Sequence, residues 1–70
     1  MRICGEDIGY GDRVRVTVSH TSAVTGTDSI TGPVVDFDVD DDGNDTLDIG
    51  YGEFYLSVLV RDIVGIERVE

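Results

Sequence analysis

The run Asp38-Val39-Asp40-Asp41-Asp42-Gly43 holds the densest set of groups in this chain that could do chemistry. Its carboxylates recur at alternate positions and a glycine follows, which is the pattern of the first half of a calcium-binding loop. Asp38, Asp40 and Asp42 are therefore the candidate metal ligands. The second half is missing, because Ile49 stands at the position that takes a bidentate Glu. A solvated acidic hairpin that holds K⁺ or Na⁺ loosely is the alternative interpretation.

Groups suited to catalysis are few. His20 and Cys4 are the plausible proton-transfer or nucleophilic side chains, and no spacing relates them to an acid in a triad or a metal set. The sequence contains no glycine-rich phosphate loop and no Cys/His zinc pattern. We expect His20 to end a strand and Cys4 to pack as a small apolar residue. The sequence thus predicts a protein that is not an enzyme and has no dedicated cofactor.

The charge composition says more about the environment in which the protein works than about a particular binding site. The chain of 70 residues has 15 acidic side chains against five arginines, no lysine, and a net charge of −10. Lysine is ordinarily common, so its loss beside an aspartate excess indicates a bias of a whole proteome, typical of a salt-accumulating halophile and, we expect, an archaeon. At molar salt the Debye length is about 3 Å and the carboxylates repel weakly. Contacts to the phosphate backbone weaken steeply under such conditions, which argues against a duplex DNA partner.

Length and cysteine content indicate one small cytoplasmic domain. A chain this short buries only roughly 60% of its unfolded surface, so a homo-oligomer is expected. The single cysteine cannot form an internal disulfide, which suggests a reducing compartment. No apolar run approaches the roughly 18 residues that span a bilayer, so no membrane partner is expected. We predict one domain over 1–70, with 1–11 as an N-terminal extension and 12–69 as a β-barrel.

The local patterns favour strands throughout. Valine and threonine are abundant, glycine punctuates at nine places, and no stretch keeps apolar residues at helical spacing. Residues 12–19 alternate valines with arginines and threonine, which predicts a half-buried strand with its arginines in solvent. After a loop over 21–28, a second strand over 29–40 changes its apolar phase, so we expect a bulge or bend at Gly32-Pro33-Val34.

The next hairpin can be given a register from its side chains. A three-residue loop Asp42-Gly43-Asn44 pairs apolar residues with apolar residues: Val39 with Leu47, Phe37 with Ile49, and Val35 with Tyr51. A two-residue turn at Asp42-Gly43 would oppose core and polar residues, so we predict the three-residue loop.

The remaining chain supplies two more strands. A strand over 53–60 is predicted to turn Phe54, Leu56, Val58 and Val60 inward. Tyr55 and Leu59 then lie on the other face as candidate interface residues. A 3₁₀ turn over 61–63 and a last strand over 64–69 complete an all-β, five-stranded fold.

This succession of elements resembles the SH3-like barrels, and the Sm-like proteins in particular. The segment Ile30-Thr31-Gly32-Pro33-Val34-Val35-Asp36-Phe37-Asp38, followed by Asn44 and Leu47, is similar to the first Sm motif. The ending Val60-Arg61-Asp62-Ile63-Val64-Gly65-Ile66 is similar to the second. The same ending, with Gly32 to Gly43, also resembles PRC-barrel domains. The resemblance implies a five-stranded, strongly bent small barrel with a 3₁₀ turn before its last strand.

The resemblance also implies candidate residues for single-stranded RNA, namely Asn44 and Arg61, to which Tyr51 could add base stacking. Departures from the Sm pattern fall at these loops, because Asn44 lies two residues too far beyond Asp38 and Asp62 replaces a glycine after Arg61. A turn asparagine, a surface arginine and a core-edge tyrosine are the alternative interpretation.

Two functions of different class follow. The first is a non-enzymatic interaction or assembly module of a halophile, which self-associates through strand edges or through Tyr55 and Leu59 and presents loops to a protein or to single-stranded RNA. The second is an acidic module in which Asp38, Asp40 and Asp42 bind Ca²⁺ and thereby stabilise the hairpin at 38–43.

Overall fold

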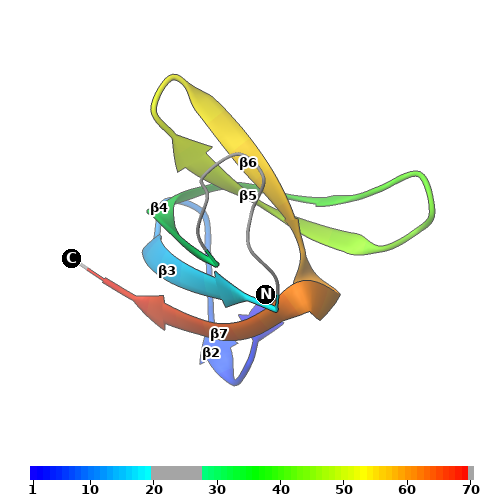
Figure 1. Ribbon diagram of the computed structural model, residues 1–70, viewed down its shortest axis with the longest axis horizontal. Helices are drawn as coiled ribbons and strands as arrows, with labels where there is room; N and C mark the ends of the chain where they lie inside the picture. Colours follow the sequence, from blue (N-terminus) through cyan, green and yellow to red (C-terminus); the bar gives the residue numbers. More distant parts are fainter. Residues whose placement is uncertain (20–27, 70) are drawn as a thin grey trace.

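The computed structural model describes residues 1–19 and 28–69, and this part of the chain is all-β with no α-helix. The elements are β1 (Arg2–Ile3), β2 (Glu6–Asp7), β3 (Arg13–Val18), β4 (Ser29–Val39), β5 (Asp45–Tyr51), β6 (Phe54–Leu59), the 3₁₀ turn η1 (Val60–Asp62) and β7 (Ile63–Arg68). Five strands form an antiparallel sheet in the order β6-β5-β4-β3-β7, and β1 and β2 form a separate two-stranded sheet (Figure 1). The predicted all-β class, the five-stranded sheet and the 3₁₀ turn before the last strand are confirmed, the turn beginning one residue earlier than expected.

Strand β3 is the centre of the best-packed part of the sheet. Its valines are buried, with Val14 and Val16 fully inaccessible to solvent, whereas Arg13 and Arg15 point outward as predicted. β4 pairs with β3 along one side and β7 along the other. β3 is therefore paired on both sides. The alternation of valine with polar residues gives it one buried face.

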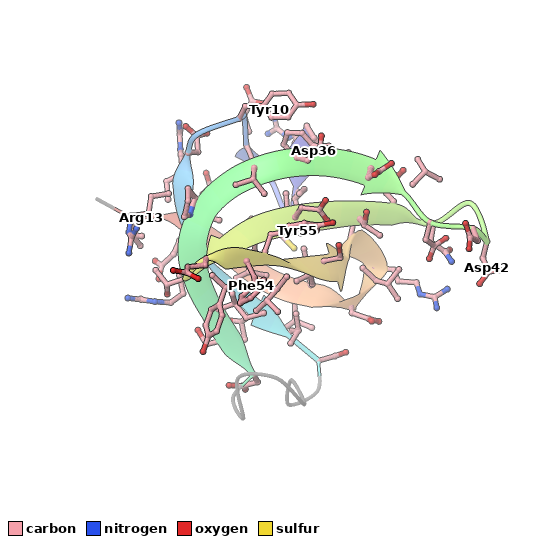
Figure 2. The ribbon with its side chains drawn as sticks, turned by 90° about the horizontal axis from the view of Figure 1, so that it is seen from above. Tyr10, Arg13, Asp36, Asp42, Phe54 and Tyr55 are labelled. Carbon is pink, nitrogen blue, oxygen red and sulfur yellow. The ribbon has the colours of Figure 1, made fainter. Side chains whose placement is uncertain are left out.

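Strand β4 is long and strongly curved, and it arches across the molecule in Figure 2. A Cβ atom on Gly32 would overlap the backbone carbonyl oxygen of Gly50, so only glycine permits the close approach of the two strands here. The ladder shifts register between Val34 and Asp36. The predicted bulge is thus present, displaced just beyond Val34.

The predicted register of the β4–β5 hairpin is wrong by two residues. Phe37 pairs with Leu47, and Val39 pairs with Asp45 rather than with Leu47. Hydrogen bonds between Asp40 and Asn44 close a three-residue loop over 41–43, one residue earlier than the predicted loop over 42–44. The bulge at Val35 brings Val34 opposite Ile49, so the buried residues still face one another.

Three apolar residues that were predicted to face the core are exposed. Val35 and Val39 are 47% and 56% exposed, and Phe54 is 78% exposed. The expectation assumed a second layer along the whole length of each strand. Residues 35–45 and the β5–β6 turn extend past that layer (Figure 1), so alternation there does not produce burial.

The N-terminal segment completes the core. β1 and β2 form a hairpin that contributes Ile3 and Ile8, which are 2% and 1% exposed, to the cluster of buried side chains. The expectation for Cys4 is wrong: Cys4 is exposed at the turn of this hairpin, in the left-handed region with φ of 50°, because its neighbour Ile3 takes the inward position. His20 and almost all of the predicted loop over 21–28 lie outside the described residues.

Within residues 1–19 and 28–69 the five-stranded sheet is not closed, so the predicted closed barrel over 12–69 is not confirmed. β6 and β7 are its two edges, and η1 alone connects them along the chain. Val58 is buried as predicted, while Leu56 and Val60 are partly buried against the core.

Candidate functional site

The acidic loop between β4 and β5 is organised around the Asp40 carboxylate. Oδ1 of Asp40 accepts hydrogen bonds from the backbone N–H groups of Asp42 and Asn44, each at 2.9 Å. The backbone N–H of Asp40 donates to the carbonyl of Asn44, and the N–H of Gly43 donates to the carbonyl of Asp40. Gly43 has a positive φ of 83°, which the tight return of the chain requires. The carboxylate of Asp40 therefore serves to hold the turn.

This hydrogen bonding has an electrostatic consequence. The backbone N–H of Asn44 holds the pKa of Asp40 below its usual value, and the side chain of Asn44, the N–H of Asp42 and the positive charge of Arg61 act in the same direction. Arg61 reaches this loop from η1, where Nη1 donates to the side-chain oxygen of Asn44 at 3.4 Å. The loop is thus held in one conformation, and the guanidinium of Arg61 already contacts it through Asn44.

A second acidic group lies beside the loop, on the outer face of β4 and β5. Ligand oxygens of Asp36, Asp38 and Asp48 all lie within 4.8 Å of one another. Asp36 and Asp48 are directly opposite across the strands, and Asp48 is only 6% exposed. Asp48 accepts a hydrogen bond of 2.5 Å from the hydroxyl of Ser57 on β6. We call these three residues the carboxylate cluster.

The structure regroups the predicted metal ligands. Asp38 belongs to the carboxylate cluster, whereas Asp40 is occupied within the loop and Asp42 is exposed at its tip. The alternation that suggested a calcium loop has a structural explanation at Asp40, because an aspartate that accepts from the N–H two residues on makes an Asx turn. Sequence spacing could not reveal Asp48, which joins the cluster only through strand pairing.

The candidate RNA residues lie in two places. Asn44 and Arg61 are brought together by their hydrogen bond. Tyr51 is at the far end of β5, which at about 3.3 Å per residue puts it on the order of 20 Å from Asn44. Tyr51 is 44% exposed and pairs with Phe54 beside the β5–β6 turn.

The candidate interface residues share one face of β6. Tyr55 is 60% exposed, and Leu59 is half-buried opposite Thr46. Sequence reasoning missed Phe54, the most exposed large apolar side chain that the structure describes. Its position next to the two-residue turn Gly52-Glu53 was the available signal, because it places Phe54 at the very end of the β5–β6 hairpin.

Two further surface features lie away from β6. Tyr10, 69% exposed, stacks edge-to-face on Phe37 with ring centroids 5.1 Å apart, and its hydroxyl lies 3.5 Å from Asp36. On the outer face of β3 and β7, a shallow hollow of about 250 Å³ is lined by Arg15, Thr17, Gly65, Ile66 and Glu67. Its charges are already paired, since Arg15 and Glu67 form a salt bridge of 2.7 Å.

A scan against protein-family models, a search of curated proteins and a search of solved structures each found no match to this chain. Among residues 1–19 and 28–69, no helix is long and apolar enough to cross a membrane. The functional interpretation therefore depends on the geometry of the acidic hairpin and of the sheet edges.

Proposed function

We propose that this protein is a non-enzymatic assembly module: a small, bent, SH3-like sheet that associates with copies of itself and presents its loops to a protein or to single-stranded RNA. The observation that carries the proposal is the open edge at β6, where Phe54 and Tyr55 are exposed on the terminal strand of the sheet. An unpaired edge offers backbone hydrogen bonds to another strand, and exposed aromatic rings add buried apolar area.

The order of elements supports the finer resemblance. A strand, a long bent strand, a hairpin, a further strand, a 3₁₀ turn and a final strand follow one another as in the Sm-like barrels. The small size of the core supports association, because a domain of this length gains stability from a partner. The composition and the single cysteine support a site of action in the cytoplasm of a salt-accumulating archaeon.

The test is the molar mass in solution, measured by light scattering on a sizing column in molar KCl with ultraviolet absorbance recorded. We expect a mass that exceeds one chain and rises with protein concentration. A mass of one chain at every concentration would exclude the assembly role. Nucleic acid that elutes with the protein would support the RNA arm of the proposal.

The RNA arm of the proposal has its own test in Arg61→Ala, which removes the positive charge beside Asn44. Arg68→Ala is the matched control, because Arg68 is also exposed and lies at the end of β7, away from this loop. Weaker oligouridine binding by Arg61→Ala alone would support the role. Equal binding by both variants would exclude it.

The carboxylate cluster favours cation binding as a second candidate function. Three carboxylates within 4.8 Å repel one another, and a cation held between them would relieve that repulsion. A specific Ca²⁺ site stabilises the fold in proportion to the logarithm of ligand concentration over Kd. Calcium titration in molar KCl, followed by the melting temperature, tests it: a rising temperature supports the site, and an unchanged temperature excludes it.

A further inference from the structure

Among the strands that the structure describes in residues 1–19 and 28–69, β6 alone carries no charge. Its sequence, Phe54-Tyr55-Leu56-Ser57-Val58-Leu59, has no acid, base, proline or glycine. Charged side chains occur in each of the other strands, namely Arg2, Glu6, Asp7, Arg13, Arg15, Asp36, Asp38, Asp45, Asp48, Glu67 and Arg68. In a chain with a net charge of −10, this strand is an exception.

This uncharged strand lies at an edge of the sheet, where proteins usually protect a strand against pairing with another chain. Natural edge strands are blunted by charges, proline or bulges. β6 has none of these, and its pairing with β5 runs without a register shift from Phe54 to Leu59. β5 is the one described strand that pairs with it. The outer side of β6 is thus a regular, uncharged template, and Phe54, Tyr55 and Val58 are strong β-forming residues.

The opposite edge is less suitable. β7 ends in Glu67 and Arg68, and the N-terminal hairpin approaches its start, where the thiol of Cys4 lies 3.5 Å from the carbonyl of Ile63. A head-to-tail contact between β6 of one copy and β7 of another would therefore place an uncharged edge strand against a charged one. The two edges are not complementary in this respect.

We propose that β6 pairs antiparallel with β6 of a second copy of this chain, around a two-fold axis, so that two five-stranded sheets become one continuous sheet. This inference rests on the proposed self-association and names the strand and the partner. A face-preserving register places Tyr55, Ser57 and Leu59 of one copy beside the same row of the other. Leu56 and Val58 meet on the core side.

The placement of charge supports the antiparallel direction. The acidic loop at residues 40–44 lies at the Leu59 end of β6, because Leu59 pairs with Thr46, two residues after the loop. Antiparallel pairing places the Leu59 end of one copy at the Phe54 end of the other. The two acidic loops then lie at opposite ends of the joined sheet, where their repulsion is smallest.

The contact is small, which sets the expected strength. A single pair of six-residue edges buries less than about 1,200 Å², the lower limit of a stable interface, so the dimer should be weak. Molar salt should strengthen it, because screening reduces the repulsion between two chains of charge −10.

Cross-linking of a single cysteine tests the geometry. In a Cys4→Ser background, Ser57→Cys puts the only thiol near the middle of β6, close to the expected two-fold axis. We expect this variant to form disulfide-linked dimers in molar KCl much faster than the wild type. The exposed Cys4 of the wild type gives the background rate of collisional linking.

An edge-blocking pair of variants gives an independent readout that needs no thiol. Tyr55→Lys puts a charge on β6, and Tyr10→Lys makes the same change at a similarly exposed residue outside β6. We expect Tyr55→Lys to weaken dimerisation at least about tenfold in sedimentation equilibrium, and Tyr10→Lys to leave it unchanged. Circular dichroism establishes whether each variant folds. If Ser57→Cys does not fold, the comparison of Tyr55→Lys with Tyr10→Lys tests the proposal.

The outcomes separate this inference from the proposed function. A wild type that stays a monomer excludes both. The wild type could associate while Ser57→Cys links no faster than background and Tyr55→Lys associates normally. That result would retain the assembly function but overturn the β6 pair. A particle of more than two chains that survives Tyr55→Lys also overturns it, in favour of another surface.

Discussion

Two regions of the sheet follow the same apolar alternation with opposite results. In the packed region, formed by β3, β7 and residues 29–34 of β4, the inward residues are buried. In the projecting region, residues 35–45, none is buried. The packed region has three arginines and one acid, whereas the projecting region has six aspartates and no base. Figure 2 shows Arg13 and Asp42, one from each region, at opposite ends of the molecule.

Alternation of apolar and polar residues creates an apolar face, but a second layer of the structure decides whether that face is buried. Ile3 and Ile8 of the N-terminal segment, together with Leu47 and Ile49 of β5, join the core cluster and supply that layer for the packed region. The projecting region has only Phe37, which is half-buried against Tyr10. Stability should therefore reside in the packed region, and the acidic hairpin should be free to contact ions or partners.

The largest effect should come from deleting a buried valine of the packed region. Val16→Ala removes two methyl groups from a fully buried site, which should lower the free energy of unfolding by about 2 kcal/mol, including the cavity term. Val39→Ala makes the same change at a residue that is 56% exposed and should lie within about 0.5 kcal/mol of wild type. Urea denaturation in molar KCl measures both. Similar losses would contradict the distinction between the regions.

A second test concerns the point where β4 leaves the packed region. Gly32→Ala introduces a Cβ that would overlap the carbonyl of Gly50, so the two strands must separate at a cost of about 1 to 3 kcal/mol. Gly65→Ala is the matched control, because the nearest atom to its Cβ is 3.9 Å away and its φ is not positive. Gly65→Ala should be neutral or slightly stabilising. Equal destabilisation of the two variants would show that the close approach at Gly32 is not what the bend requires.

The sequence predicted the packed region well and the projecting region poorly, for physical reasons. The valines of β3 alternate without interruption, so their inward face and the outward arginines could be assigned directly. The hairpin register could not, because it depends on the side chain of Asp40 accepting two backbone N–H groups, an alternative that apolar matching does not include. Phe54 was misplaced because strand alternation does not reveal where the opposite layer ends.

The same limits apply to the candidate site. Asp38 was found from its position in the acidic run, and Asp36 lies two residues before it on the same strand, but Asp48 joins them only through the pairing of β5 with β4. Asn44 and Arg61 were expected to be close through a resemblance and are within hydrogen-bond distance. Tyr51 was grouped with them by residue type alone, and the length of β5 keeps it apart.

A smaller effect should distinguish the carboxylate cluster from general negative charge. Asp38→Asn removes one charge from three carboxylates that lie within 4.8 Å, and should stabilise the fold by roughly 1 kcal/mol in dilute buffer. Asp45→Asn changes the net charge equally, on the same hairpin but outside the cluster, and should stabilise it less. In molar KCl the difference should vanish, because the Debye length is about 3 Å. Melting temperatures at both salt concentrations measure this, and identical gains for both variants in dilute buffer would contradict it.

The smallest effect should be the acid dependence of the hairpin loop. Because hydrogen bonds lower the pKa of Asp40 in the folded state, its contribution to stability is fully present above the usual aspartate pKa of about 3.9 and is lost as the pH falls through the lower folded value. Carboxyl NMR titration should therefore place Asp40 below about 3.9. Arg61→Ala should raise the pKa only slightly, since the backbone N–H of Asn44 is the larger cause. A return to the usual value in Arg61→Ala would instead make the charge from η1, rather than the loop geometry, the source of the lowered pKa.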